Sequence, residues 1–266
     1  MSNEKQHIVE VQPPQPLSPR RKKMSELWRN GQLCDAEVVS SDGRKFNAHR
    51  LVLATNSNYM EALLAEDRFQ DSSGCPIPLR DVSSCTLEKI LEWMYVGSCG
   101  DFQTTNEAVE VLEAACFLQC RDLVKQLVTS LLDTIDAENC LHMWELGERL
   151  HLEELTSKAT HVAASNFASL ASGDEFEKLP FARLCQILDV EDLTDDANQA
   201  ELYMSIMRWA KAQDVLPSGE DLEQLLDYLH FARMDKSFVE EHVLRNPLLL
   251  DNPICFRPVA QSLLSG

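Results

Sequence analysis

The sequence predicts an α+β domain, built from a small sheet with a cluster of helices, followed by an all-α domain of stacked short helices. Two strand-like runs, residues 36–39 and 44–47, flank the Asp42-Gly43 dipeptide, which is a strong hairpin signal. The apolar spacing then becomes helical, and no convincing strand follows Asp136. Over 266 residues we therefore expect two domains that meet near residue 134.

The N-terminal 23 residues are expected to form a flexible tail. They contain four prolines among polar residues: Pro13, Pro14, Pro16 and Pro19. Such a segment cannot bury enough apolar surface to order itself. The basic run at residues 20–23 is consistent with a nuclear-import patch or with the solvated start of a helix, and the second interpretation is favoured.

A short amphipathic helix is expected from Met24 to Asn30. Met24, Leu27 and Trp28 share one face, and Gly31 is expected to end the helix. An exposed apolar turn of this kind requires a partner.

The signals that follow the hairpin are helical, with one short interruption. Residues 50–54 and 59–64 are rich in Leu, Ala, Met and Glu, which favours helices. The prolines within residues 75–79 restrict that run to an edge or to a very short strand. Gly97 is expected to end the next helix, and Thr104 with Glu107 has the spacing of a capping box.

Apolar stripes at helical spacing mark the remaining helices. In the first half they are Val109, Leu112 and Cys116, then Leu123, Leu127, Val128, Leu131 and Ile135. In the second half they are Leu152, Leu155, Ala159 and Val162; Phe181, Leu184 and Leu188; Leu202, Ile206 and Trp209; and Leu222, Leu225, Leu226 and Leu229.

The charge of the chain excludes several classes of partner. The 43 Asp and Glu residues outnumber the 24 Lys and Arg residues, for a formal charge of −19. Such a surface repels nucleic acid and anionic membranes. No apolar run approaches the length of a signal peptide core or of a membrane span, so we expect a cytoplasmic protein that can also be nuclear.

The cysteines are interpreted as reduced core thiols. The nine cysteines are spread from Cys34 to Cys255, mostly within apolar helical windows. Cys116 and Cys120 share a helix face, as half of a zinc site would, but no second pair completes four ligands by spacing. A thiol-sensing role for Cys85 and Cys99 stays open, although neither has an adjacent basic residue.

No motif predicts an enzyme. The sequence has no Gly-x-Ser-x-Gly turn, no glycine-rich phosphate loop and no His-Glu-x-x-His pair. We therefore expect a non-catalytic protein with no cofactor and no metal.

Several motifs of the first half resemble the signature of the BTB (POZ) domain, and motifs of the second half are similar to the BACK domain of kelch-like proteins. The first group comprises Leu33–Asp35, the run Phe46–Ala54 (FNAHRLVLA) with Ser57 and Tyr59, Leu91–Gly97 (LEWMYVG) and Leu112–Gln119 (LEAACFLQ). The second comprises Asn139-Cys140-Leu141, Leu155 with Ala159, Asn166-Phe167, Phe176 with Leu179-Pro180, and Arg208-Trp209. On this resemblance, residues 24–133 are the BTB domain, residues 134–262 the BACK domain and residues 263–266 a tail.

The resemblance implies a homodimer formed through the first helix, with Met24, Leu27 and Trp28 in the dimer interface. It also implies that a cullin-3 scaffold binds the BTB face and the first BACK helices. The motif implied for the cullin contact is Phe69-Gln70-Asp71, in which Phe69 is an apolar anchor and Asp71 stands where the family usually has Glu.

One polar cluster interrupts the apolar BTB-like unit, at Asp35, His49 and Arg50. The resemblance suggests a functional charged pocket at the dimer surface. The alternative, which is favoured, is a partly buried structural pair, because a carboxylate that leaves water needs a cation or hydrogen-bond donors.

Two functions follow from the resemblance. The first is a homodimeric adaptor that binds cullin-3 and positions a partner for ubiquitination. The second is a dimeric scaffold or regulator without ubiquitin-ligase function, which heterodimerises with kelch-containing relatives and blocks them. With nine glycines in all, no propeller of glycine-rich blades is expected in this chain. Either the substrate-binding part has been removed, or an unknown substrate or regulatory protein binds the BACK helices or the Pro-containing tail.

Overall fold

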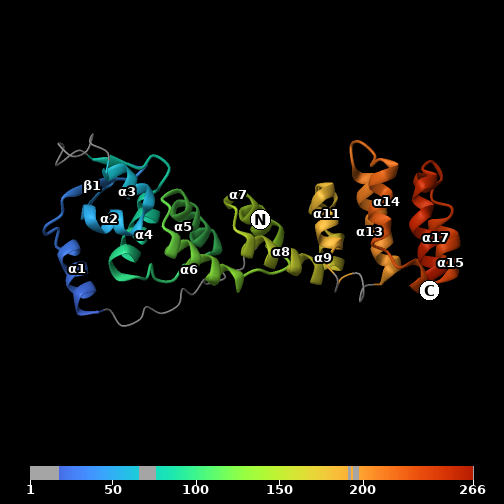
Figure 1. The fold of residues 1–266 in the computed structure, drawn as a ribbon, viewed down its shortest axis with the longest axis horizontal. Helices are drawn as coiled ribbons and strands as arrows, with labels where there is room; N and C mark the ends of the chain where they lie inside the picture. The colour runs from blue at the N-terminus through green and yellow to red at the C-terminus, as the bar shows by residue number, and fades with distance from the viewer. Residues whose placement is uncertain (1–17, 66–75, 191–192, 194–197, 266) are drawn as a thin grey trace. The chain divides into compact units, whose positions relative to one another are not determined.

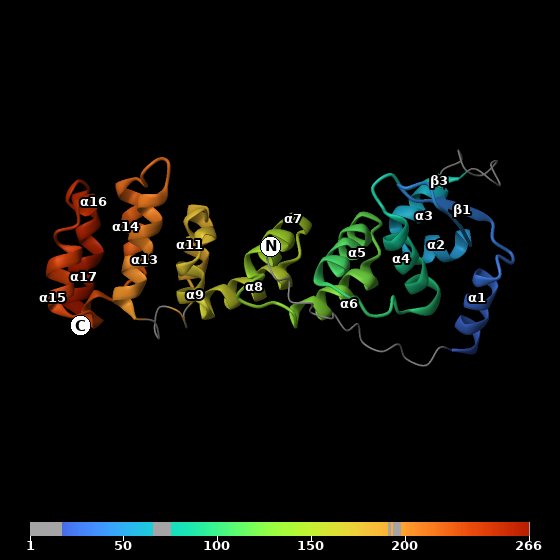
Figure 2. The same ribbon diagram turned by 180° about the vertical axis from the view of Figure 1, so that it is seen from behind.

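The computed structural model describes residues 18–65, 76–190, 193 and 198–265. The chain forms two compact units (Figures 1 and 2). The first comprises Met1–Thr134 together with Arg149–Leu155, and the second comprises Ile135–Glu148 together with Thr156–Gly266. No helix among the described residues is long and apolar enough to cross a membrane.

The first unit contains a three-stranded sheet with the order β2-β1-β3. The central strand β1 (Ala36–Val39) pairs antiparallel with β2 (Lys45–Ala48) and parallel with β3 (Ile77–Pro78). Val38 pairs with Phe46 on one side and with Ile77 on the other, and all three side chains are buried. β2 begins one residue later than predicted, and β3 is the very short edge strand that its prolines favour.

The predicted turn chemistry joins β1 to β2. Gly43 has a φ of +83°, a backbone conformation that glycine adopts without steric cost. The Asp42 carboxylate accepts hydrogen bonds from the hydroxyls of Ser40 and Ser84, and these bonds lower the pKa of Asp42, with Ser40 the larger cause.

The remaining elements of the first unit are helices. They are α1 (Pro19–Arg29), α2 (Arg50–Asn56), α3 (Asn58–Ala65), α4 (Ser84–Val96), α5 (Thr105–Phe117) and α6 (Arg121–Leu132). Their buried positions follow the predicted stripes, with Leu123, Leu127, Val128 and Leu131 all buried on α6.

The helix α1 begins five residues before Met24, so the expectation of a flexible tail was wrong for residues 19–23. The Ser18 hydroxyl accepts a hydrogen bond from the backbone N–H of Arg21. Pro19 occupies the first helical position, where a backbone N–H would have no acceptor within the helix, so the lack of an N–H in proline loses no hydrogen bond. The basic run is therefore the start of a helix.

Arg21 also attaches α1 to α4. Its guanidinium donates hydrogen bonds to the carbonyls of Trp93 (3.4 Å) and Tyr95 (3.3 Å) in the last turn of α4. A cation is stabilised there because the last carbonyls of a helix carry partial negative charge. Gly97 ends α4 as predicted, with a φ of +86°.

The predicted capping box at the start of α5 is only half formed. The Thr104 hydroxyl accepts from the backbone N–H of Glu107 at 3.2 Å. The Glu107 carboxylate accepts from Gln103 instead, at 2.9 Å, one residue before the cap.

The second unit contains only helices within the described residues. They are α7 (Cys140–Leu150), whose last two residues belong to the first unit, α8 (Glu153–Ser165), whose first three residues also belong to the first unit, α9 (Phe167–Ser172), α10 (Asp174–Glu177), α11 (Phe181–Leu188), α13 (Gln199–Ala212), α14 (Gly219–Asp227), η2 (Phe231–Arg233), α15 (Lys236–Phe238), the π-helix η3 (Val239–Val243), α16 (Pro247–Leu250), η4 (Pro253–Cys255) and α17 (Phe256–Ser265). The all-helical class predicted for this half is confirmed.

Replacing Gly97 with Ala should destabilise the fold more than replacing Gly43 with Ala. Both glycines have left-handed φ angles, so each Ala costs about 1–2 kcal/mol in backbone strain. A Cβ on Gly97 would also lie 2.8 Å from the Arg21 guanidinium, whereas nothing lies within 4 Å of the position at Gly43. Because Arg21 must then leave its carbonyls, we expect a further loss of about 1 kcal/mol in urea unfolding.

A double-mutant cycle isolates this contact. In an Arg21→Ala background, Gly97→Ala and Gly43→Ala should lower the free energy of unfolding by equal amounts. Equal losses in the unaltered chain would contradict the assignment of Arg21 to the end of α4.

Candidate functional site

The helix α1 packs against its own domain through one aromatic residue. The Trp28 ring stacks on the Tyr95 ring, with centroids 4.5 Å apart and planes 1° from parallel. The Trp28 indole N–H donates to the carbonyl of Asn47 at 3.0 Å. Trp28, which the resemblance places in a dimer interface, thus makes contacts within the chain, and it stays partly exposed on α1, as Met24 and Leu27 do.

The three residues of the predicted charged pocket contact three different partners. The Asp35 carboxylate accepts a hydrogen bond from the backbone N–H of Arg50 (2.7 Å) at the start of α2. The Arg50 guanidinium donates to the carbonyl of Leu64 (3.1 Å) near the end of α3. His49 Nδ1 lies 2.7 Å from the Tyr95 hydroxyl. The cluster therefore links α2, α3 and α4 through helix ends and a buried tyrosine.

Two exposed leucines lie beside this cluster. Leu33 is 78% exposed and Leu51 is 74% exposed, and the hydrogen bond between Asp35 and the Arg50 N–H joins their segments. The sequence did not indicate their exposure, because the apolar residues around Leu51 do not distinguish an exposed leucine from a buried one. We call Met24, Leu27, Leu33 and Leu51 the α1 face.

A second apolar surface lies around the end of α5. The rings of Tyr59 on α3 and Phe117 on α5 pack 5.1 Å apart, and Phe117 remains 46% exposed. Cys116, directly before Phe117, lines a cavity of about 600 Å³ that we call the α5–α6 groove. The groove is lined by Cys116, Gln119, Arg121, Val124, Lys125, Val128, Leu150, His151, Leu152, Glu153 and Glu154, all of which belong to the first unit.

The rims of the α5–α6 groove are formed by two helix ends. Gln119 and His151 have left-handed φ angles of 54° and 55°, which is uncommon for residues other than glycine. Each follows a helix, α5 for Gln119 and α7 for His151. An ion pair between Arg149 and Glu113 holds the segment that carries His151 against α5. Segments distant in sequence therefore meet in one groove.

Comparison with known protein families assigns both halves of the chain. Residues 24–135 match the model of the BTB/POZ domain, and residues 140–244 match the model described as BTB And C-terminal Kelch, or BACK. The chain is a BTB-BACK protein.

Its curated relatives are kelch-like proteins. Human Kelch-like protein 7 is 27% identical over 241 residues, and human Kelch-like protein 30 is 29% identical over 238 residues. Each alignment covers 90% of this chain and 40% of the relative, so the chain spans about two fifths of their length. The solved BTB domain of zebrafish PATZ1 aligns with 44% of this chain and 90% of its own, at 20% identity and a TM-score of 0.37.

In the BTB-BACK chain, the α5–α6 groove combines residues of the BTB helices with residues 150–154, which lie in the first part of the BACK match. Sequence reasoning missed it, because a helical stripe shows which residues share a face and not which segment covers that face. The residues predicted to contact cullin, Phe69 and Asp71, lie outside the described residues, which stop at Ala65 and resume at Pro76.

The described thiols of the BTB domain differ in exposure. Burial raises the pKa of Cys99 to about 11 and that of Cys120 to about 12, so both stay protonated at neutral pH. Burial also raises the pKa of Cys116. Cys85 is exposed. Of the two cysteines considered for thiol sensing, only Cys85 is thus accessible in the folded protein.

Pulse labelling with iodoacetamide should modify Cys85 before Cys99 and Cys120. The thiolate is the reactive form, and the two buried thiols carry little of it at pH 8. Peptide mapping by mass spectrometry after short pulses would measure the order, with a urea-unfolded sample as the control. Equal labelling rates for the three thiols in the folded protein would contradict their burial.

Proposed function

We propose that this BTB-BACK protein is a homodimeric adaptor that binds cullin-3 and positions a partner protein for ubiquitination. The α1 face forms the dimer interface, and the α5–α6 groove with the Tyr59–Phe117 pair forms the cullin-3 surface. Ubiquitin transfer is catalysed by other proteins of the complex.

The observation that carries the proposal is the position of the α5–α6 groove. The resemblance implies that cullin-3 binds the BTB face and the first BACK helices, and the groove is lined from both. Phe117, which directly follows Cys116 of the groove lining, is an exposed aromatic residue of the kind that commonly dominates the energy of protein interfaces. Phe69 and Asp71 are proposed as further contacts of the same partner.

The α1 face supports the dimer in a similar way. Leu33 and Leu51 are each more than 70% exposed. Burying their apolar surface in a dimer interface would lower the free energy of the system relative to the monomer in water. Arg21 and Trp28 fix α1 on its own domain, so Met24 and Leu27 are presented in a defined position.

Truncating the proposed cullin contacts should weaken binding without changing the dimer. We expect Phe117→Ala and Phe69→Ala each to raise the Kd for the purified N-terminal region of cullin-3 about fivefold or more, since a buried aromatic anchor contributes at least about 1 kcal/mol. Isothermal titration calorimetry measures the change. Asp71→Glu, which restores the usual family residue, should bind at least as tightly as the unaltered chain.

The matched control for this series is Phe181→Ala, which truncates a partly exposed phenylalanine of the second unit. It should leave the Kd unchanged. If the unaltered chain does not bind cullin-3, the adaptor function is wrong and the dimeric scaffold takes its place.

A charge on the α1 face should separate the dimer. Leu51 is largely exposed, so Leu51→Glu should leave the folded monomer intact and place carboxylates in the interface of the dimer. Sedimentation velocity should show monomer at concentrations where the unaltered chain is dimeric. Val215→Glu, at a position that is 84% exposed in the second unit, is the control. A dimer that survives Leu51→Glu would reject the α1 face as the interface.

A further inference from the structure

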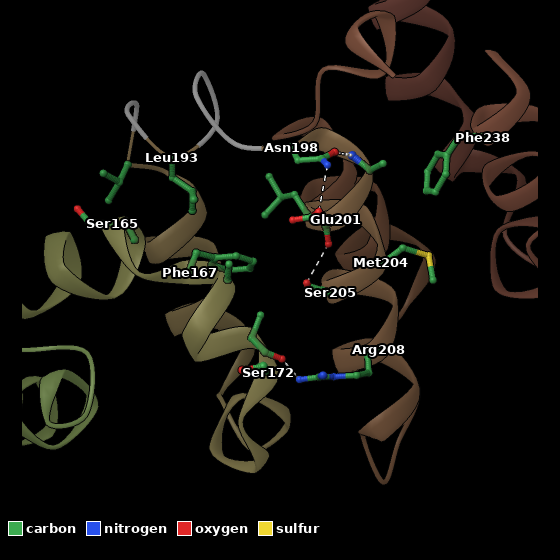
Figure 3. Close-up of a pocket in the computed structure, with 16 residues that line it drawn as sticks. Ser165, Phe167, Ser172, Leu193, Asn198, Glu201, Met204, Ser205, Arg208 and Phe238 are labelled. Carbon is green, nitrogen blue, oxygen red and sulfur yellow. Dashed lines mark hydrogen bonds between the residues drawn. The ribbon is translucent and has the colours of Figure 1, made fainter. Parts of the chain in front are cut away.

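The second unit carries two adjoining hollows along α13. The first has a volume of about 750 Å³ and lies between α13 and the segment that includes the end of α8 and α9 (Figure 3). The second has a volume of about 530 Å³ and lies between α13 and the segment from η3 to α16. Met204, Ser205 and Arg208 line both, so the hollows form one continuous surface, the α13 groove.

The helical period explains why α13 has an open face. Positions 202, 203, 206, 207, 209 and 210 are buried in the unit. Glu201, Met204, Ser205 and Arg208 follow one another at intervals of three or four residues on the opposite face. Met204 is 50% exposed, and its unbranched thioether side chain adapts readily to the shape of a partner.

The first hollow has a mostly apolar lining, with Glu201 as the one carboxylate among its described lining residues. Figure 3 shows Phe167 facing the hollow from α9, opposite Glu201 and Ser205 of α13. Phe238 closes the side next to Met204, where its ring packs against the Tyr203 ring at 6.0 Å. A hollow of this size accepts a bulky apolar side chain.

The second hollow is basic, in contrast to the chain as a whole. Arg208, Lys211, His242 and Arg245 line it, with Glu241 as the one carboxylate among its described lining residues. Lys211 and Arg245 are exposed, and neither has an ion pair within the part of the chain that the structure describes. The chain as a whole has a formal charge of −19. Lys211 and Arg245 therefore form a local positive surface beside the first hollow, and such a surface attracts an anionic partner.

Arg208 fixes the junction of the two hollows. Its guanidinium donates to the carbonyl of Ala171, pairs with Glu177 at 3.2 Å and lies over the Phe176 ring at 5.6 Å. The charge of Arg208 is therefore used within the unit, and its side chain holds α13 to α9 and α10. The cations left for a partner are Lys211 and Arg245.

We infer that the α13 groove binds a linear acidic segment of a partner protein. A bulky apolar side chain enters the first hollow, and the Asp or Glu residues next to it lie against Lys211 and Arg245. The inference concerns a site in the BACK domain and does not depend on cullin-3 binding by the BTB domain. Nucleic acid is disfavoured as the occupant, because the remainder of the acidic surface repels a longer phosphate chain.

Three fluorescein-labelled dodecapeptides test the inference with the full chain. The first contains Phe and Leu followed by four Asp and Glu residues, the second replaces the acids with Asn and Gln, and the third replaces Phe and Leu with Ala. By fluorescence anisotropy we expect the first peptide to bind at least tenfold more tightly than the other two. Its affinity should fall as salt is raised from 50 to 300 mM, because exposed charges are screened.

Charge reversal locates the bound peptide. Lys211→Glu with Arg245→Glu should weaken binding of the first peptide at least tenfold. Arg80→Glu with Lys158→Glu makes the same change in net charge at exposed positions outside the groove and should weaken it less than threefold. Circular dichroism and unchanged midpoints of urea unfolding would show that both variants are folded.

Three outcomes would overturn the inference. They are no binding of the first peptide at 1 mM, equal losses in the two charge-reversed variants, and equal affinity for the acidic and the neutral peptide. A change in oligomeric state on reversal of Lys211 and Arg245 would also overturn it, because the occupant would then be a second copy of the chain.

Discussion

The contacts of Tyr95 hold together the helices and the sheet segment of the BTB domain. The Tyr95 ring is fully buried and stacks on Trp28 of α1, its carbonyl accepts from Arg21, and its hydroxyl accepts from the backbone N–H of His49 at 2.8 Å. One side chain on α4 thus joins α1 to the segment that leads from β2 to α2. Burial raises the pKa of Tyr95 to about 12.

This contact has consequences for function. With α1 held by Trp28 and Arg21, Met24 and Leu27 are fixed on the domain and stay partly exposed, and Leu33 and Leu51 are largely exposed. The Asp35, His49 and Arg50 cluster lies next to Leu33 and Leu51 in the sequence and fixes helix ends and the Tyr95 hydroxyl. The cluster is therefore the support of the proposed dimer interface, and the apolar side chains are its contact surface.

The BTB and BACK domains offer surfaces of different character. The α5–α6 groove has polar residues such as Gln119 and His151 in its lining and the exposed Phe117 next to it in the sequence, whereas the α13 groove combines a mostly apolar hollow with the exposed cations Lys211 and Arg245. An adaptor needs one surface for its scaffold and another for the protein that it delivers. The proposed assignment of the first groove to cullin-3 and of the second to an acidic partner meets both needs within one chain.

Local signals in the sequence predicted much of this fold. The hairpin at Gly43 and the end of α4 at Gly97 were predicted, because glycines at turns and helix ends determine the backbone conformation of the few residues around them. The helical second half was predicted from the helical spacing of its apolar residues. The basic run at residues 20–23 was interpreted as the start of a helix, but the helix itself was expected only from Met24, because prolines among polar residues indicated a tail. Arg21 attaches this first turn through carbonyls that lie more than 70 positions away in the sequence.

The sites were harder to predict than the fold. The resemblance named the dimer helix but could not show that Trp28 faces its own domain. The α5–α6 groove requires the segment that contains His151 to return to α5, and the α13 groove requires η3 to pack beside Met204. No local pattern records such contacts between distant segments, so these sites emerged only from the structure.

The central claim is that one chain both dimerises and binds cullin-3. Light scattering on a mixture of the full chain with the purified N-terminal region of cullin-3, separated by size exclusion, tests it most directly. The account predicts a single species with the mass of two chains and two cullin fragments. Separate elution of the cullin fragment from the chain, or a complex with one copy of each, would contradict it.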